Sequence, residues 1–146
     1  MMVRKLTVLF LSLVLLCGCS LGKKTEEGPA ESAGPITVEV WGPAEAEALV
    51  RGTLDQFASE NGIEIRYVAE ADATMRDSIL TDIAAAGDVF LLTEAAVEDL
   101  KSAGALYDFG GGSYTIPAAE GYVIAVNARR SAAETAVKLA EALKQS

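Results

Sequence analysis

Apolar and polar residues alternate along this chain with two different periods. Four segments either alternate every second residue or run continuously apolar, and both patterns predict β-strands. The predicted strands cover residues 36–41, 63–68, 88–92 and 121–127. After each strand, apolar residues recur three or four positions apart, which predicts an amphipathic helix. The predicted helices cover 44–60, 74–86, 94–103 and 132–143.

Capping residues mark several of these ends. Gly87 is placed to cap the end of the second predicted helix, and Thr93 to cap the start of the third. Ser131 and Glu134 have the spacing of a capping box, which would open the last helix. The Gly-Gly-Gly-Ser run at 110–113 predicts a flexible joint.

The strand–helix unit repeats four times, which predicts the fold class. We expect an α/β protein with three αβα layers and a mostly parallel sheet of about four to five strands. The predicted core faces are Ala46, Val50, Leu54, Phe57 and Ala58 on the first helix, and Ala133, Val137, Ala140 and Leu143 on the last.

The first residues of the chain differ in character from this domain. A basic start, Arg4 and Lys5, leads into an apolar run that is too short for a membrane-spanning helix, so residues 1–18 are predicted to be a secretory signal peptide. Residues 19–35 are rich in Gly, Lys, Glu, Ser and Pro and are expected to form a flexible tether. Residues 36–146 form the single predicted domain.

The end of the signal peptide, Leu16-Cys17-Gly18-Cys19, resembles a bacterial lipobox. The resemblance implies cleavage before Cys19 and attachment of acyl chains to that residue. Several acyl chains anchor a protein stably where one does not. We therefore expect an extracytoplasmic, lipid-anchored protein at the cell membrane. The alternative is an ordinary signal peptide cut after another small residue.

Composition narrows the function classes. The 146 residues include 12 Lys+Arg, 21 Asp+Glu and no His, with a net charge of −9. Loss of residues 1–18 removes two basic residues and no acid, so the remaining 128 residues carry −11. Such a charge disfavours nucleic-acid binding. Without His or a recognised catalytic, phosphate-binding or dinucleotide motif, we expect neither an enzyme nor a metal or cofactor site.

Four segments resemble the first lobe of extracellular solute-binding proteins of ABC importers, the group that includes maltose-binding and molybdate-binding proteins. They are Ile36-Thr-Val-Glu-Val-Trp-Gly42, Phe57-Ala-Ser-Glu-Asn-Gly-Ile-Glu-Ile65, Ile83-Ala-Ala-Ala-Gly-Asp-Val-Phe-Leu91 and Leu100-Lys-Ser-Ala-Gly-Ala-Leu106. Residues 122–127 and 132–143 resemble the strand and helix that return to this lobe. Two features depart from the family: residues 110–113 stand where a second lobe is usual, and no Pro precedes Asp88. The resemblance therefore implies a single periplasmic-binding-protein-like lobe.

Ligands of open α/β sheets bind beyond the carboxyl ends of the strands. The candidate ligand-binding residues there are Trp41, Gly42 and Pro43 after the first strand, Glu70 and Asp72 after the second, and Thr93 and Glu94 after the third. The resemblance adds Tyr114, Glu120 and Tyr122.

Each candidate has a structural alternative. Trp41 could be a partly buried side chain that closes the end of the sheet. Thr93 could cap the following helix, with Glu94 as an acidic residue in its first turn. Tyr114 and Glu120 could be solvated loop residues, and Tyr122 could belong to the sheet. For Glu70, Asp72 and Asp77, a solvated acidic face is favoured over calcium binding, because the spacing is not that of an EF-hand.

Together these observations predict a monomeric solute-binding lipoprotein of an ABC transporter. Its expected partners are a small solute such as a sugar or an oxyanion, the permease subunits, and the membrane through the lipid anchor. The alternative is a single-lobe lipoprotein that displays a protein-interaction module.

Overall fold

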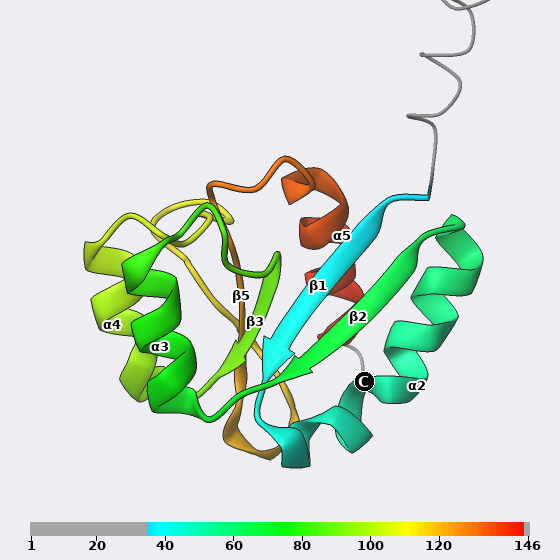
Figure 1. Cartoon of the computed structure of the whole chain (residues 1–146), viewed down its shortest axis with the longest axis horizontal. Helices are drawn as coiled ribbons and strands as arrows, with labels where there is room; N and C mark the ends of the chain where they lie inside the picture. The colour runs from blue at the N-terminus through cyan, green and yellow to red at the C-terminus, as the bar shows by residue number, and fades with distance from the viewer. Residues whose placement is uncertain (1–34, 145–146) are drawn as a thin grey trace, which may run out of the picture. The chain divides into compact units, whose positions relative to one another are not determined.

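The computed structural model describes residues 35–144. The predicted signal peptide, Cys19 and almost all of the predicted tether lie outside the described residues. The elements, in chain order, are β1 (Thr37–Gly42), α2 (Ala44–Asn61), β2 (Glu64–Ala69), α3 (Asp72–Thr81), β3 (Val89–Leu92), α4 (Glu94–Ser102), β4 (Ile116–Pro117), the 3-10 turn η1 (Ala119–Gly121), β5 (Val123–Val126) and α5 (Ala133–Leu143) (Figure 1). Among these elements, no helix is long and apolar enough to cross a membrane.

The five strands form one sheet in the order β2-β1-β3-β5-β4. β1 pairs in parallel with β2 and β3, whereas β5 runs antiparallel to both β3 and β4. The α/β prediction is confirmed, but the sheet is parallel only over β1, β2 and β3. The reversal follows from a short connection, since η1 turns the chain directly from β4 back into β5, and a tight turn joins antiparallel strands.

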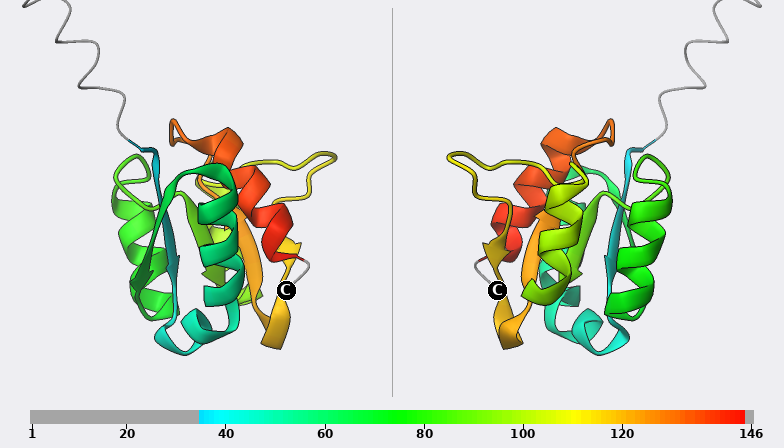
Figure 2. Two further views of the ribbon diagram at one scale, coloured as in Figure 1. Left: turned by 90° about the vertical axis from the view of Figure 1, so that its right-hand side faces the viewer. Right: turned by 90° about the vertical axis from the view of Figure 1, so that its left-hand side faces the viewer.

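Helices cover both faces of the sheet, as predicted. One core joins α2 and α5 to Val38, Val40, Val89, Leu91, Ile124 and Val126. The second joins α3 and α4 to Phe90, Leu92 and Ala125. Figure 2 shows α2 beside α5 in its left view and α3 beside α4 in its right view. Because both faces are covered, all four residues of β3 are buried, which explains its continuous apolar run.

The apolar stripe of the second predicted helix extends beyond the helix itself. Met75 and Ile79 are buried in α3, but the helix ends at Thr81 instead of residue 86. Asp82 is extended, and its carboxylate accepts a hydrogen bond from the Ala85 amide (3.2 Å). Gly87 is therefore not a helix cap.

The predicted capping box of the last helix also needs correction. Ala132, not Ser131, is the N-cap of α5, and no side chain bonds to this end of the helix. Glu134 instead accepts a hydrogen bond from Lys138 (3.1 Å). The buried residues of α5 are Ala136, Leu139, Ala140 and Leu143, so the prediction is right at two positions, while Ala133 and Val137 are half-buried. On α2 four of the five predicted positions are buried, and Ala58 is half-buried.

The glycine run at 110–113 forms a closed turn. The Phe109 amide donates to the Ser113 carbonyl (2.8 Å) and the Ser113 amide to the Gly110 carbonyl (3.2 Å). Gly111 and Gly112 have φ of +65° and +81°, values that glycine adopts without the strain a Cβ would cause.

Candidate functional site

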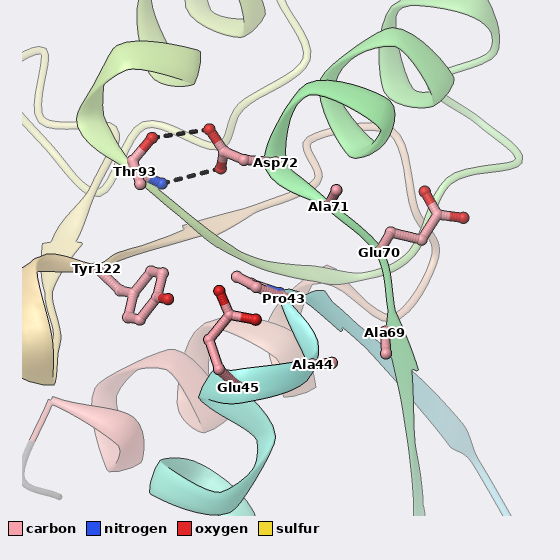
Figure 3. Close-up of a pocket in the computed structure, with 9 residues that line it drawn as sticks. All are labelled: Pro43, Ala44, Glu45, Ala69, Glu70, Ala71, Asp72, Thr93 and Tyr122. Carbon is pink, nitrogen blue, oxygen red and sulfur yellow. Dashed lines mark hydrogen bonds between the residues drawn. The ribbon is translucent and has the colours of Figure 1, made fainter.

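A pocket of about 320 Å³ lies beyond the carboxyl ends of the three parallel strands (Figure 3). Its lining residues come from the start of α2, the turn between β2 and α3, the start of α4 and the segment before β5. They are Pro43, Ala44, Glu45, Ala69, Glu70, Ala71, Asp72, Thr93 and Tyr122. We call this the carboxyl-edge pocket.

Three helices begin at the carboxyl-edge pocket. The N-caps of α2, α3 and α4 are Pro43, Ala71 and Thr93, and none makes a side-chain capping bond within its own helix. The first amides of a helix lack intrahelical partners and carry partial positive charge. The pocket therefore has backbone donors on three sides, alongside carboxylates and hydroxyls that can accept hydrogen bonds.

A close contact fixes the floor of the pocket at the end of β1. The Tyr67 hydroxyl donates to the Pro43 carbonyl (2.7 Å), which holds the entry into α2. A Cβ at Gly42 would lie 2.4 Å from that hydroxyl and 2.9 Å from Cβ of Leu91. Only glycine leaves room for these neighbours. Burial, followed by the charge of Glu47, raises the pKa of Tyr67 to about 12, so this donor keeps its proton at neutral pH.

The start of α4 is tied to the start of α3. The Asp72 carboxylate accepts the Thr93 amide at one oxygen (3.1 Å) and the Thr93 hydroxyl at the other (2.7 Å). Thr93 is at the N-cap position, as predicted, but its hydroxyl bonds to a neighbouring helix instead of its own. These two bonds fix the relative position of two pocket walls.

Tyr122 and Glu45 form another wall. Figure 3 shows the Tyr122 hydroxyl directed towards the Glu45 carboxylate. Partial burial and the negative, hydrogen-bonding Glu45 carboxylate raise the pKa of Tyr122. A second hollow of about 310 Å³ is lined by Glu45, Leu49, Glu120 and Tyr122, so two of its residues are shared with the pocket.

Glu70 contributes to the pocket in another way. Its amide donates to the Gly42 carbonyl (2.8 Å), which continues the β1–β2 pairing. In Figure 3 its carboxylate turns away from the middle of the lining group. One carboxylate oxygen of Glu70 is buried without a hydrogen-bond partner among the described residues.

The structure brings together part of the predicted site. Pro43, Thr93 and Tyr122 line the carboxyl-edge pocket, and Glu120 lines the adjoining hollow. Gly42 lies beneath the pocket, where its lack of a side chain admits Tyr67.

Trp41, Glu94 and Tyr114 do not line the pocket. Trp41 packs on the α3–α4 side, edge to face with Phe90 (6.3 Å between ring centroids) and against Gly87. These contacts match the alternative in which it closes the sheet. Tyr114 packs against the same core with Lys101 5.5 Å from its ring, and Glu94 is exposed in the first turn of α4.

Among the polar residues that line the pocket, Glu45 is the one that was not predicted from the sequence. An acidic residue in the first turn of a helix usually stabilises the helix end, so the pattern alone did not distinguish it from Glu94. Its position two residues after Pro43, just beyond the end of the first strand, was the available indication. The acidic group considered for calcium does not assemble, because among residues 35–144 no three acidic, Cys or His side chains are placed to hold a metal ion.

Comparison with known proteins finds no family for this chain and a weak structural similarity. No family model matches the chain, and no curated protein does. A solved structure described as "with acarbose" is similar to this chain, with 26% sequence identity and a TM-score of 0.47. The similarity covers 62% of this chain and 29% of that one, so the matched region spans less than a third of the solved chain. A likeness at this level carries no functional argument.

Proposed function

We propose that this protein is a lipid-anchored, extracytoplasmic solute-binding protein of an ABC importer, and that the carboxyl-edge pocket holds its solute. The convergence of three helix starts without side-chain caps on one open pocket carries the proposal. The lipobox-like residues at Cys19 and the resemblance of residues 36–106 to a solute-binding lobe support it.

The chemistry of the pocket suits a small polar molecule. Backbone amides offer donors, while Glu45 and the hydroxyls of Tyr122 and Thr93 offer acceptors. The volume of about 320 Å³ lies at the lower end of the range of about 300–1,000 Å³ for small-molecule sites. Binding is favoured over catalysis, because the chain has no His and no recognised catalytic motif.

Calorimetric titration of the purified full chain in detergent tests solute binding. The trial solutes are neutral sugars, amino acids, small organic cations and small oxyanions, each added to the wild type and to Tyr122→Ala. We expect heat of binding with at least one solute, and a loss of affinity of at least about tenfold in the variant, because an aromatic wall of the pocket is removed. Equal affinity in both proteins would place the solute elsewhere, and no binding by any solute would overturn the proposal.

The anchor is tested separately. Mass spectrometry of the membrane fraction should find the chain beginning at Cys19 with acyl chains attached, and Cys19→Ala should release the protein from the membrane. An unmodified residue 19 in a membrane-bound wild type would contradict the anchor.

A second function, docking to another protein, is favoured by the hollow next to the pocket. Leu49 is 43% exposed there, beside Glu45, Glu120 and Tyr122. Crosslinking from position 49 in cells distinguishes the two functions: a protein partner outside any transporter favours docking, whereas permease subunits alone favour transport.

A further inference from the structure

The position that an anion would take at the start of α4 already holds a carboxylate of the protein. Asp72, the first residue of α3, accepts both the amide and the hydroxyl of Thr93 (3.1 Å and 2.7 Å). A helix start commonly binds phosphate, sulfate or a solute carboxylate through these same groups. Asp72 thus makes from within the chain the contacts that a bound anion would otherwise make.

Apart from the backbone amides at the helix starts, the rest of the pocket offers an anion no positively charged partner. None of the nine lining residues is Lys or Arg, and Glu45 and Glu70 add two further carboxylates, that of Glu70 turned away from the middle of the lining group (Figure 3). Neither Asp72 nor Glu45 makes an ion pair with another described residue. An anionic solute would need to displace Asp72 from Thr93 and then remain close to two like charges, which repel it.

We infer that Asp72 determines the charge selectivity of the carboxyl-edge pocket: by occupying the anion position of α4 it restricts the pocket to neutral or cationic solutes. The inference rests on the proposed function for its biological meaning. It also narrows the classes of solute expected for the pocket: of the two predicted from the sequence, a sugar remains expected and an oxyanion does not.

The test is a gain of anion binding when Asp72 is shortened. Sulfate is titrated into the full chain in detergent, and the amide resonance of Thr93 is followed by NMR. The wild type should bind sulfate weakly or not at all at this position. Asp72→Ala frees the Thr93 amide and hydroxyl and removes a negative charge, so its sulfate affinity should rise at least about tenfold.

Asp77→Ala is the matched control. Asp77 lies on the same helix, its carboxylate contacts Arg76 instead of α4, and its loss changes the net charge equally. It should leave sulfate binding at Thr93 unchanged. If Asp72→Ala fails to fold, Asp72→Ser provides the same opening with a shorter polar side chain.

Sulfate binding at Thr93 in the wild type as tight as in the variant would overturn the inference, and so would no gain in the folded Asp72 variant. A gain of equal size in Asp77→Ala would also overturn it, because net charge alone would then explain the effect. The outcome is separable from that of the proposed function. Failure of every trial solute to bind the wild type would defeat solute transport, yet would leave the comparison of sulfate affinities unaffected. Binding of an oxyanion alone would overturn the inference about Asp72 and leave the proposed function standing.

Discussion

The polar groups at the two ends of the parallel strands differ in how they are hydrogen-bonded within the protein. At the amino end, Asp88 is 1% exposed and accepts both the Glu39 amide (2.8 Å) and the Arg130 guanidinium (3.0 Å). Buried Asn127 donates to the carbonyls of Ile83 (2.7 Å) and Gly87 (3.0 Å). At the carboxyl end, by contrast, three helix starts lack their own side-chain caps and a Glu70 oxygen is buried without a partner among the described residues.

The difference separates a region whose buried polar side chains are paired within the protein from one where, apart from the Asp72–Thr93 pair, the helix-start amides have no side-chain partner among the described residues. Polar groups paired within the protein add rigidity and leave few hydrogen-bond donors or acceptors free for a ligand. Polar groups without internal partners weaken the fold slightly but are free for a solute. If this division holds, changes at the amino end should alter the free energy of unfolding with little effect on binding, and changes at the carboxyl end should alter both.

Arg130→Met should produce the largest loss of stability. It removes the charged partner of a buried carboxylate, which costs about 3 kcal/mol in comparable sites. Because Arg130 is itself 31% exposed, we expect about 2–3 kcal/mol in urea-induced unfolding. Arg129→Met is the matched control, since the Arg129 side chain bonds to no other residue within 35–144, and it should cost less than about 0.5 kcal/mol. Equal losses in the two variants would contradict the role of the Asp88 pair, and solute affinity of folded Arg130→Met should match that of the wild type.

Gly42→Ala should affect both properties at the carboxyl end. The added Cβ would meet the Tyr67 hydroxyl and Leu91, and overpacking of this kind costs about 1–3 kcal/mol. It should also weaken solute binding, because Tyr67 positions Pro43 at the pocket floor. Gly52→Ala is the control, as nothing lies within 4 Å of its added Cβ and alanine favours a helix, so it should stabilise by up to about 1 kcal/mol. A Gly42→Ala protein with unchanged stability and binding would show that the floor tolerates displacement.

How much of this could be predicted from the sequence depends on the range of the interaction. The apolar periodicity correctly placed Leu54 and Phe57 in the core, because burial of one helix face leaves a local pattern. It did not find the end of α3, since Ile83 continues the stripe although Asp82 has left the helix. The antiparallel direction of β5 was also missed, because it depends on pairing of distant strands that a run of apolar residues does not encode.

For the carboxyl-edge pocket too, the sequence predicts only what depends on local pattern and topology. Pro43 and Thr93 were found from their positions after strands, a rule that follows from topology. Trp41 precedes Pro43 by two residues, yet it lies on the α3–α4 side against Gly87. Its direction depends on which face of β1 each residue occupies and on the space that Gly87 leaves, and neither can be read from residue type.

A smaller change in the free energy of unfolding is expected when Tyr67 loses its proton at high pH. The pKa of Tyr67 is raised in the folded protein from 10.0 to about 12, so unfolded chains lose this proton first as the pH rises. The stabilisation that comes from the neutral phenol is complete below pH 10 and is lost as the pH approaches about 12. Urea unfolding between these values should show a steeper fall in stability for the wild type than for Tyr67→Phe. Parallel curves for the two proteins would contradict the assignment.

The smallest expected effect concerns two residues that the sequence alone presents as equivalent helix caps. Ser131→Ala should change the free energy of unfolding by less than about 0.5 kcal/mol, because Ala132 is the N-cap of α5 and no side chain bonds there. Thr93→Val should cost about 1 kcal/mol, since the Thr93 hydroxyl bonds Asp72 and its loss leaves that carboxylate short of a donor. Thr93→Val should also change the pocket, whereas Ser131→Ala should not. A loss of about 1 kcal/mol in Ser131→Ala would mean that a capping box forms in solution, with Glu134 bonded to the helix start instead of Lys138.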